Sequence, residues 1–142
     1  MSEQNFKNHT RLSGGYHGLT FSLILILLVG AIRYWSRAAT EDKYAPVLFV
    51  LTAVILIFLF FFIRIFALRA QDRAIRAEEN LRHFFLTGKA FDRSLRLGQI
   101  IALRFASDEE LPALAERAAR EKLAPKDIKM AIRNWRADHH RV

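Results

Sequence analysis

The chain has 142 residues, is 52% hydrophobic and carries a formal net charge of +8. This length accommodates one small domain plus membrane segments, and excludes two sizeable globular domains. No cysteine is present, which excludes disulfide bonds, thiolate metal sites and cysteine nucleophiles. The apolar residues concentrate in residues 16–68, whereas residues 69–142 are strongly charged, so the two halves are expected to meet different environments.

The chain begins with a polar leader, residues 1–15, which is followed by a first apolar span at about 16–35. Tyr16 precedes the span, and Tyr34 and Trp35 end it. Aromatic residues of this kind sit at the headgroup level of a bilayer, so we expect these three to act as membrane anchors. A cleavable signal peptide is the alternative interpretation. The long leader and the flanking aromatic residues favour a span that is retained.

The second span, at about 45–66, contains the 19 uncharged residues of Ala45–Ile63. At helical rise they cover roughly 28 Å, the thickness of a hydrocarbon core. Pro46 falls in the first turn, where its missing N–H costs little. The sequence therefore predicts a transmembrane helical hairpin.

Basic residues predict the direction of the hairpin. Four arginines follow the second span closely, whereas the short link between the spans carries as many acidic as basic residues. The four are Arg64, Arg69, Arg73 and Arg76. The positive-inside rule then places both termini in the cytoplasm.

The helical pattern does not stop at the end of the second span. Small and apolar residues recur at steps of three and four from Ala67 to Phe84, and Glu78 and Arg82 stand at the spacing of an i,i+4 ion pair. Thr87-Gly88 is the first stop signal. We therefore expect one helix of about 40 residues that begins in the second span. Its apolar stripe consists of Ala67, Ala70, Ala74, Ala77, Leu81 and Phe84.

Three shorter helices are expected after this long one. The first covers about 91–105, with Gly98 permitting close approach of a neighbouring helix. The second opens at Ser107, where Ser107 and Glu110 have the spacing of a capping box. The third begins at Pro125 and carries Ile128, Ile132 and Trp135 on one face. The predicted fold is all-α: a transmembrane helical hairpin whose second helix continues into a small, basic, cytoplasmic three- to four-helix domain, residues 69–142.

Two kinds of interaction site are suggested by these patterns. Arg64, Arg69, Arg73 and Arg76 are expected either to bind anionic lipid headgroups or only to set topology and solvate the helix. The apolar face of Ile128, Ile132 and Trp135, or the alanine-rich stripe, is expected to dock a partner. Nucleic acid is not an expected partner, because acidic residues are interleaved with the basic ones and the aromatic residues fall on apolar stripes.

No pattern in the sequence points to catalysis or to a cofactor. The chain has no phosphate-binding loop, no nucleophile elbow and no metal-ligand spacing, and neither span has an ionisable residue in its interior. The consecutive acids of Asp108–Glu110 are better explained as a helix start than as paired catalytic carboxylates. We therefore expect a protein that is not an enzyme and holds no cofactor.

Four phrases of the sequence together resemble a known family. They are Gln4-Asn5 with Asn8-His9, QDRAIRAEENLR at 71–82, IALRFASDEEL at 101–111 and IKMAIRNWRADHHRV at 128–142. In this order they are similar to an uncharacterised family of small bacterial membrane proteins with two spans and a cytoplasmic helical tail. The resemblance implies location in the inner membrane and brings no catalytic residue with it.

The size of the tail shapes the functional expectation. A domain of this size that relies on alanine has a marginal core and gains stability from a partner or from self-association. The leading hypothesis is a non-catalytic accessory or scaffold subunit of an inner-membrane complex. The alternatives are a membrane-surface adaptor that binds anionic lipid through its arginines, and a structural component of a transporter.

Overall fold

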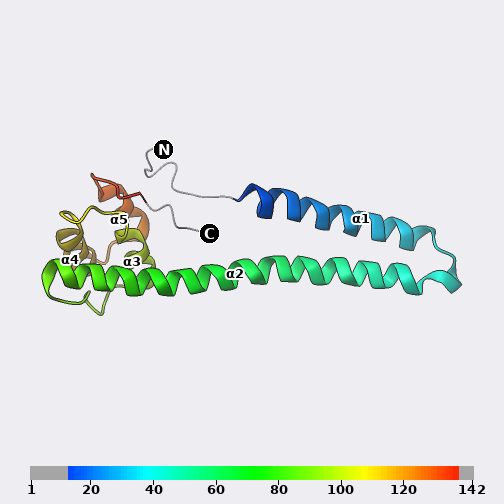
Figure 1. Ribbon diagram of the computed structural model, residues 1–142, viewed down its shortest axis with the longest axis horizontal. Coiled ribbons are helices and arrows are strands. Elements are labelled where there is room, and N and C mark those ends of the chain that lie inside the picture. Colours follow the sequence, from blue (N-terminus) through cyan, green and yellow to red (C-terminus); the bar gives the residue numbers. More distant parts are fainter. Residues whose placement is uncertain (1–12, 138–142) are drawn as a thin grey trace. The chain divides into compact units, whose positions relative to one another are not determined.

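The computed structural model describes residues 13–137, and this part of the chain is helical without any β-strand, as predicted (Figure 1). Its helices are η1 (Gly14–Thr20), α1 (Phe21–Arg37), η2 (Thr40–Asp42), α2 (Tyr44–Thr87), α3 (Leu97–Leu103), α4 (Leu111–Glu121) and α5 (Pro125–Ala131). The described residues form two compact units that divide between Ala67 and Leu68. We call them the hairpin and the tail. Most of the polar leader and the last five residues, with His139 and His140, lie outside the described residues.

The hairpin begins with a π-helical turn, η1, that runs directly into α1. The Thr20 hydroxyl donates to the Gly15 carbonyl oxygen at 3.0 Å, a five-residue separation that matches π-helical geometry. Helix α1 ends at Arg37, where Ala38 becomes extended. The short helix η2 then leads into α2. The first helical stretch thus covers 24 residues, slightly more than the predicted span.

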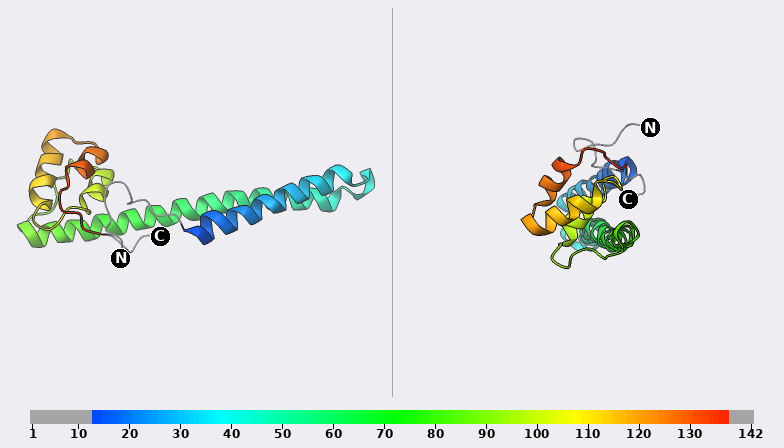
Figure 2. Two further views of the ribbon diagram at one scale, coloured as in Figure 1. Left: turned by 90° about the horizontal axis from the view of Figure 1, so that it is seen from above. Right: turned by 90° about the vertical axis from the view of Figure 1, so that its left-hand side faces the viewer.

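Aromatic contacts hold α1 and the first half of α2 side by side as an antiparallel pair (Figures 1 and 2). The Tyr16 ring stacks on Phe60 at 4.3 Å between ring centroids, and its hydroxyl donates to the Phe60 carbonyl oxygen. Near the turn, the Tyr34 and Phe49 rings lie 6.3 Å apart. Ala53 is fully buried, and such small residues allow helices to pack closely in a membrane. Tyr34 and Trp35 are about half exposed, and their role as membrane anchors remains a prediction.

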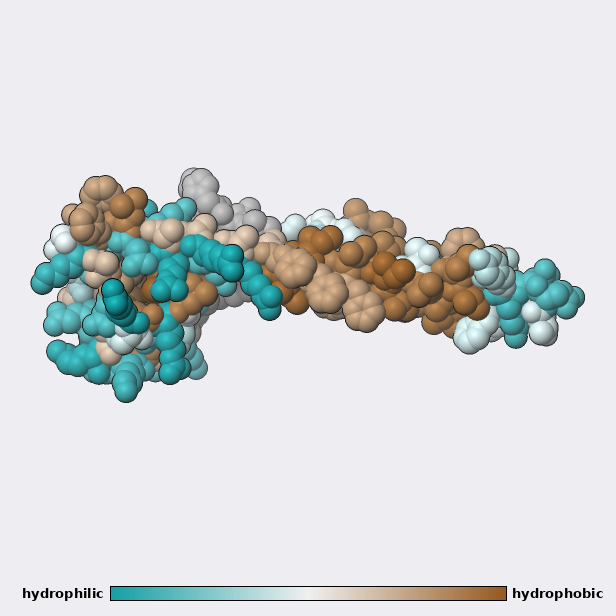
Figure 3. Space-filling view, turned by 90° about the horizontal axis from the view of Figure 1, so that it is seen from below, coloured by the Kyte–Doolittle hydropathy of each residue, from teal (hydrophilic) through white to brown (hydrophobic). Residues whose placement is uncertain are grey.

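The hairpin exposes its apolar side chains. Figure 3 shows hydrophobic residues covering it, whereas hydrophilic residues dominate the surface of the tail. Gly14–Arg37 and Tyr44–Thr87 are long and apolar enough to cross a membrane by length and composition. In each, only 11% of the most apolar stretch is buried, whereas a helix in the core of a soluble protein would be mostly buried. The hairpin surface is therefore compatible with a lipid environment.

Helix α2 is one uninterrupted helix of 44 residues, as the lack of a stop signal before Thr87 predicts. At helical rise it is about 66 Å long. It ends at Thr87, and the next residue, Gly88, has a φ of +70°, the left-handed conformation that glycine adopts most easily. The Gly88 N–H closes the last turn by donating to the Phe84 carbonyl oxygen at 2.7 Å.

The tail has a single hydrophobic core made by α3, α4 and α5, which lie along one side of the last turns of α2 (Figure 2). Gly98 lies where α3 meets α5, and a Cβ there would stand 3.4 Å from a side-chain carbon of Pro125. A Cβ at this distance would make an ordinary van der Waals contact, so the helices meet at Gly98 and the need for glycine there stays a prediction. The largest fully buried side chains of this core are Phe105, Ile100, Leu103, Leu111 and Ile128.

Three predicted helices of the tail are shorter than expected, and the one predicted to open at Ser107 begins at Leu111. The helix predicted at 91–105 begins only at Leu97, because the Asp92 carboxylate accepts from the Ser94 N–H at 2.8 Å and stabilises a turn. Phe91 and Leu95 are buried from a loop. The last helix begins at Pro125, as predicted, but ends at Ala131.

Candidate functional site on helix α2

The tail packs on a largely polar face of α2. Ile75, Glu79 and His83 are buried, and their four-residue spacing places them on one side of the helix. Only Ile75 among these three is apolar. The interaction of α2 with the remainder of the tail therefore depends on ion pairs and hydrogen bonds as well as on apolar packing.

Arg82 is the centre of these polar contacts. Its Nη1 lies 2.9 Å from the Glu79 carboxylate, and its Nε donates to the Asp108 carboxylate at 2.7 Å. Its Nη2 donates to the Ala106 carbonyl oxygen at 2.8 Å. The sequence predicted a pair with Glu78, but the observed partner on the helix is Glu79. Glu79 faces the tail, where Asp108 also meets the guanidinium.

The pair of Arg82 and Glu79 is removed from water, with side-chain exposures of 11% and 10%. Asp108 is 61% exposed, so its pairing with Arg82 is worth little. Breaking a buried pair by removing one partner costs about 3–5 kcal/mol, because it leaves the other charge buried and uncompensated. The pair thus fixes where the tail attaches to α2, whatever its net contribution to stability.

Hydrogen bonds hold residues 133–136 beside the Arg82 network. Glu110 accepts from the N–H groups of Arg133 and Asn134 at 3.2 and 3.4 Å. The Ser107 N–H donates to the Asn134 carbonyl oxygen at 3.2 Å, and the Arg136 N–H donates to that of Phe105 at 2.8 Å. These bonds accompany an isolated antiparallel bridge between Ala106 and Trp135. They explain why the last helix stops early: the backbone of 133–136 pairs with the 105–107 segment instead.

The predicted capping box is wrong. Helix α4 begins at Leu111, and the residue before it, Glu110, makes no side-chain capping bond. Ser107 instead contributes its carbonyl oxygen, which accepts from the Leu111 N–H at 3.0 Å. The capping pattern was misleading because the Glu110 carboxylate accepts from the backbone N–H groups of Arg133 and Asn134. These residues are distant in the sequence, so no local pattern predicts the contact.

The predicted docking patch is also wrong. Ile128 is fully buried and Ile132 is 6% exposed, so both belong to the core. Trp135 is half-buried, and its ring lies 5.0 Å from that of Phe105. The amphipathic spacing was real for Ile128, but its apolar face covers α3 rather than a partner. A core this small depends on both isoleucines for much of its apolar volume.

The alanine-rich stripe of α2, in contrast, is exposed. Ala70, Ala74 and Ala77 lie on the surface, and Leu81 and Phe84 are 55% and 50% exposed. Phe85 beside them is 78% exposed. Helical spacing places most of these residues on the side of α2 that faces away from the tail core, whereas Ala74 stands at the edge of that side and also lines a pocket with Arg104 and Arg136. We call them the outer face: Ala70, Ala74, Ala77, Leu81, Phe84 and Phe85.

The predicted arginine cluster is only partly brought together. Arg69, Arg73 and Arg76 are exposed and stand at i, i+4 and i+7, so they form a ridge along one side of α2. Arg64 is half-buried, and its spacing from Arg69 points it in another direction. Three arginines therefore remain as candidates for contact with anionic headgroups.

His83 has a structural role that sequence reasoning did not assign. Its Nδ1 lies 2.8 Å from the Lys89 carbonyl oxygen, and its ring centroid lies 4.4 Å from that of Phe91. The Thr87 hydroxyl donates to the His83 carbonyl oxygen at 2.8 Å. These contacts fold the chain back immediately after α2 ends. A lone histidine in a charged helix gives no sign of such a turn.

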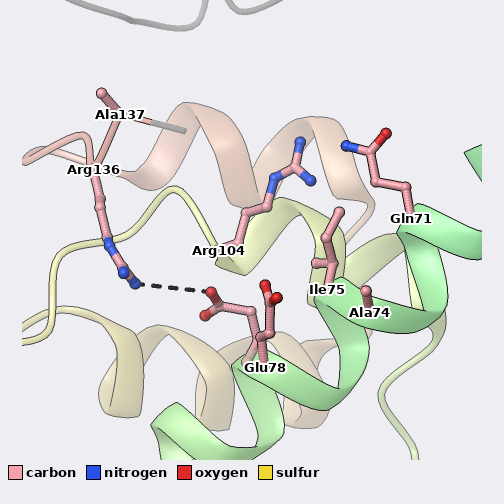
Figure 4. Close-up of a pocket in the computed structure, with 8 residues that line it drawn as sticks. Gln71, Ala74, Ile75, Glu78, Arg104, Arg136 and Ala137 are labelled. Atoms are coloured by element: carbon pink, nitrogen blue, oxygen red, sulfur yellow. Dashed lines mark ion pairs between the residues drawn. The ribbon is translucent and has the colours of Figure 1, made fainter. Parts of the chain in front are cut away.

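A pocket of about 290 Å³ opens beside the Arg82 network, and Figure 4 shows the side chains that line it. Arg136 points toward the Glu79 carboxylate at 3.8 Å, and Glu78 and Arg104 also face the space. Two carboxylates and two guanidinium groups offset one another. The pocket thus offers no net charge with which to select an ionic ligand.

Three exposed carboxyl groups of the tail have lowered pKa values. The Ser107 hydroxyl, whose geometry falls short of a full hydrogen bond, lowers the pKa of the exposed Glu109 carboxyl. The Ser94 N–H lowers the pKa of Asp92, and Arg117 lowers that of Glu121. A general acid at neutral pH needs a raised carboxyl pKa instead. Within residues 13–137, no three metal-ligating side chains come together.

The fold and surfaces define a class of protein: an all-α chain with two long apolar helices and a small charged helical tail. A family model covers residues 1–142. The chain belongs to this family, DUF6526, which is described as a family of unknown function. Comparison with curated proteins and with solved structures gave no match.

Proposed function

We propose that the chain is a non-catalytic accessory or scaffold subunit of a bacterial inner-membrane complex. The hairpin crosses the membrane, both termini are cytoplasmic, and the tail docks through the outer face of α2. The exposure of Leu81, Phe84 and Phe85 is the observation that carries this proposal. Large apolar side chains gathered on one exposed face are typical of interaction sites.

The composition of the tail supports the same proposal. The tail keeps Ile128 and Ile132 in its core, yet leaves the aromatic pair at the end of α2 outside it. The two Phe rings lie 6.5 Å apart, so they present a joint apolar surface. Covering Phe85 alone would remove most of its surface from water, which is worth roughly 1.5–3 kcal/mol for such a side chain.

Native mass measurement after gentle solubilisation tests this proposal. The full chain is expected to have a mass above that of the monomer, and Leu81→Glu with Phe84→Glu is expected to reduce it to the monomer. Arg76→Glu is the matched control, because it adds a similar charge change on an exposed position outside the outer face. Recovery of the unaltered chain only as a monomer in several mild detergents would contradict the subunit proposal.

The arginine ridge supports a second candidate, a membrane-surface adaptor that binds anionic lipid. Arg69 follows Ile63 by six residues, or about 9 Å along the helix, which places it at headgroup depth if Ala45–Ile63 fills the hydrocarbon core. Each such charge contributes about 1 kcal/mol near an anionic surface. Changing Arg69 and Arg76 to Gln is expected to reduce retention of acidic over zwitterionic lipid without loss of insertion. Unchanged lipid selectivity would rule this candidate out.

A further inference from the structure

The outer face of α2 has the spacing of a coiled-coil seam. From Ala67 through Ala70, Ala74, Ala77 and Leu81 to Phe84, the steps alternate strictly between three and four residues. Their mean of 3.5 residues is that of a heptad repeat, in which these residues take the a and d positions. The pattern runs for two and a half heptads and ends where α2 ends.

The tail occupies other positions of the same heptads. Ile75 and Arg82 fall at b, His83 at c and Glu79 at f, which all lie away from the a and d seam. A helix that packs along the seam would therefore displace none of the contacts of the Arg82 network. The seam and the tail contacts thus lie on different sides of α2, with Ala74 and Glu78 at the boundary, where both line the pocket beside Arg136.

The seam combines small and large residues. Its alanines allow two helix backbones to approach closely, whereas Leu81 and Phe84 supply apolar area at one end. Phe85 stands at the adjoining e position and is 78% exposed. Alanines alone would not indicate a contact, but this exposed aromatic end does.

The charges beside the seam identify the occupant. Arg73 is at g and Glu78 is at e of the following heptad, the two positions that face each other across a parallel pair of helices. Both side chains are exposed, and Glu78 stands at the rim of the pocket, from which its carboxylate can turn toward the seam. In a parallel pair of identical helices, Arg73 of each copy meets Glu78 of the other, so two-fold symmetry forms this ion pair twice.

We propose that the outer face binds the same face of a second copy of this chain, in a parallel and in-register pair of α2 helices. This inference rests on the proposed function, since two copies inserted with one topology necessarily have parallel α2 helices. Confinement to a membrane raises their effective concentration, so a short seam suffices. Arg73 and Glu78 set the register, and Leu81 and Phe84 supply the apolar contact.

Single-cysteine crosslinking in native membranes tests the pair, because the chain has no cysteine of its own. Ala74→Cys, Ala77→Cys and Leu81→Cys are expected to form disulfide-linked dimers on mild oxidation. Arg69→Cys and Arg76→Cys, which are exposed at c positions, are expected to remain monomeric. Crosslinking at all three positions requires a parallel, in-register pair, because an antiparallel pair brings a residue beside its own copy only near the two-fold axis. Equal crosslinking at all five positions, or none at Ala74 and Ala77, would overturn the proposal.

Charge exchange tests the register independently. Arg73→Glu and Glu78→Arg are each expected to weaken the dimer roughly tenfold, because two exposed ion pairs become repulsive contacts. The double variant, which restores opposite charges, is expected to recover most of the loss. Failure of the double variant to recover would refute the pairing of Arg73 with Glu78.

A partner of another sequence gives a different result. In that case, Leu81→Glu would still abolish the heavier species seen by native mass measurement, while that species would contain only one copy of this chain. Such a result would keep the subunit proposal and overturn the self-association proposal. A monomer unaffected by any of these changes would overturn both.

Discussion

Replacing Arg82 is expected to detach the tail from α2. In Arg82→Met, the Glu79 carboxylate stays buried at 10% exposure and loses its partner at 2.9 Å. Arg136, at 3.8 Å and largely exposed, compensates only in part. The variant is therefore expected to lose roughly 3 kcal/mol, at the lower end of what removing one member of a buried pair costs. For a domain with a stability of about 5 kcal/mol, this is most of the total.

Trp135 provides the assay, because its ring packs against Phe105 in the tail core. The other tryptophan, Trp35, lies in the hairpin, so a Trp35→Phe background isolates the tail signal. Urea denaturation of the full chain in nanodiscs, followed by fluorescence, then reports the free energy of unfolding of the tail. Arg76→Met, at an exposed position of the same helix, is the control and is expected to change it by less than about 0.5 kcal/mol.

A double variant separates the ion pair from general damage to the fold. Glu79→Gln with Arg82→Met removes both charges, so no charge is left buried alone, and it is expected to be more stable than Arg82→Met. If the two single losses simply added in the double variant, or if Arg82→Met cost no more than Arg76→Met, the reasoning about the buried pair would be refuted.

Three further predictions concern the tail. Glu110→Ala is expected to accelerate amide hydrogen exchange of Arg133 and Asn134, because the acceptor of their N–H groups is lost, whereas Glu116→Ala should leave this exchange unchanged. Acidification is expected to destabilise the tail. The pKa values of Asp92, Glu109 and Glu121 are lowered by folding, so these carboxylates stabilise the tail when the pH is above their unfolded pKa values. This stability is lost as the pH falls below about 4. A urea midpoint that rises between pH 5 and 3 would contradict this sign. Gly88→Ala is expected to cost about 1 kcal/mol in the same assay, since a Cβ at φ +70° is strained although no neighbour obstructs it; an unchanged midpoint would show that the turn relaxes.

The sequence predicted those elements whose signals are local. The uncharged run of Ala45–Ile63 and the missing stop signal before Gly88 were enough to predict α2 as a single helix. Pro125 marked the start of the last helix for the same reason. Each of these features depends on residues only a few positions apart, so no knowledge of the tertiary structure was needed.

The features that the sequence did not predict depend on distant partners. Arg82 donates a hydrogen bond to Asp108, 26 positions away, and Glu110 accepts one from the Arg133 N–H, 23 positions away. The contact of Glu110 replaced the predicted capping box, and the pairing of 133–136 with 105–107 shortened the last helix. The docking patch was misplaced because amphipathic spacing shows that a face is apolar, but not whether the chain itself covers it. Ile132 was covered, and Phe85 was not.

Thiol labelling of the outer face in native membranes tests most directly whether this face is a contact surface. Phe85 is 78% exposed in the isolated chain, so a single cysteine in its place tests this face, and Arg76→Cys provides an exposed reference on the same helix. We expect a water-soluble alkylating reagent to modify the cysteine at 85 at least about tenfold more slowly than the cysteine at 76. Strong detergent should abolish the difference. Equal and rapid labelling of both positions in intact membranes would contradict the account.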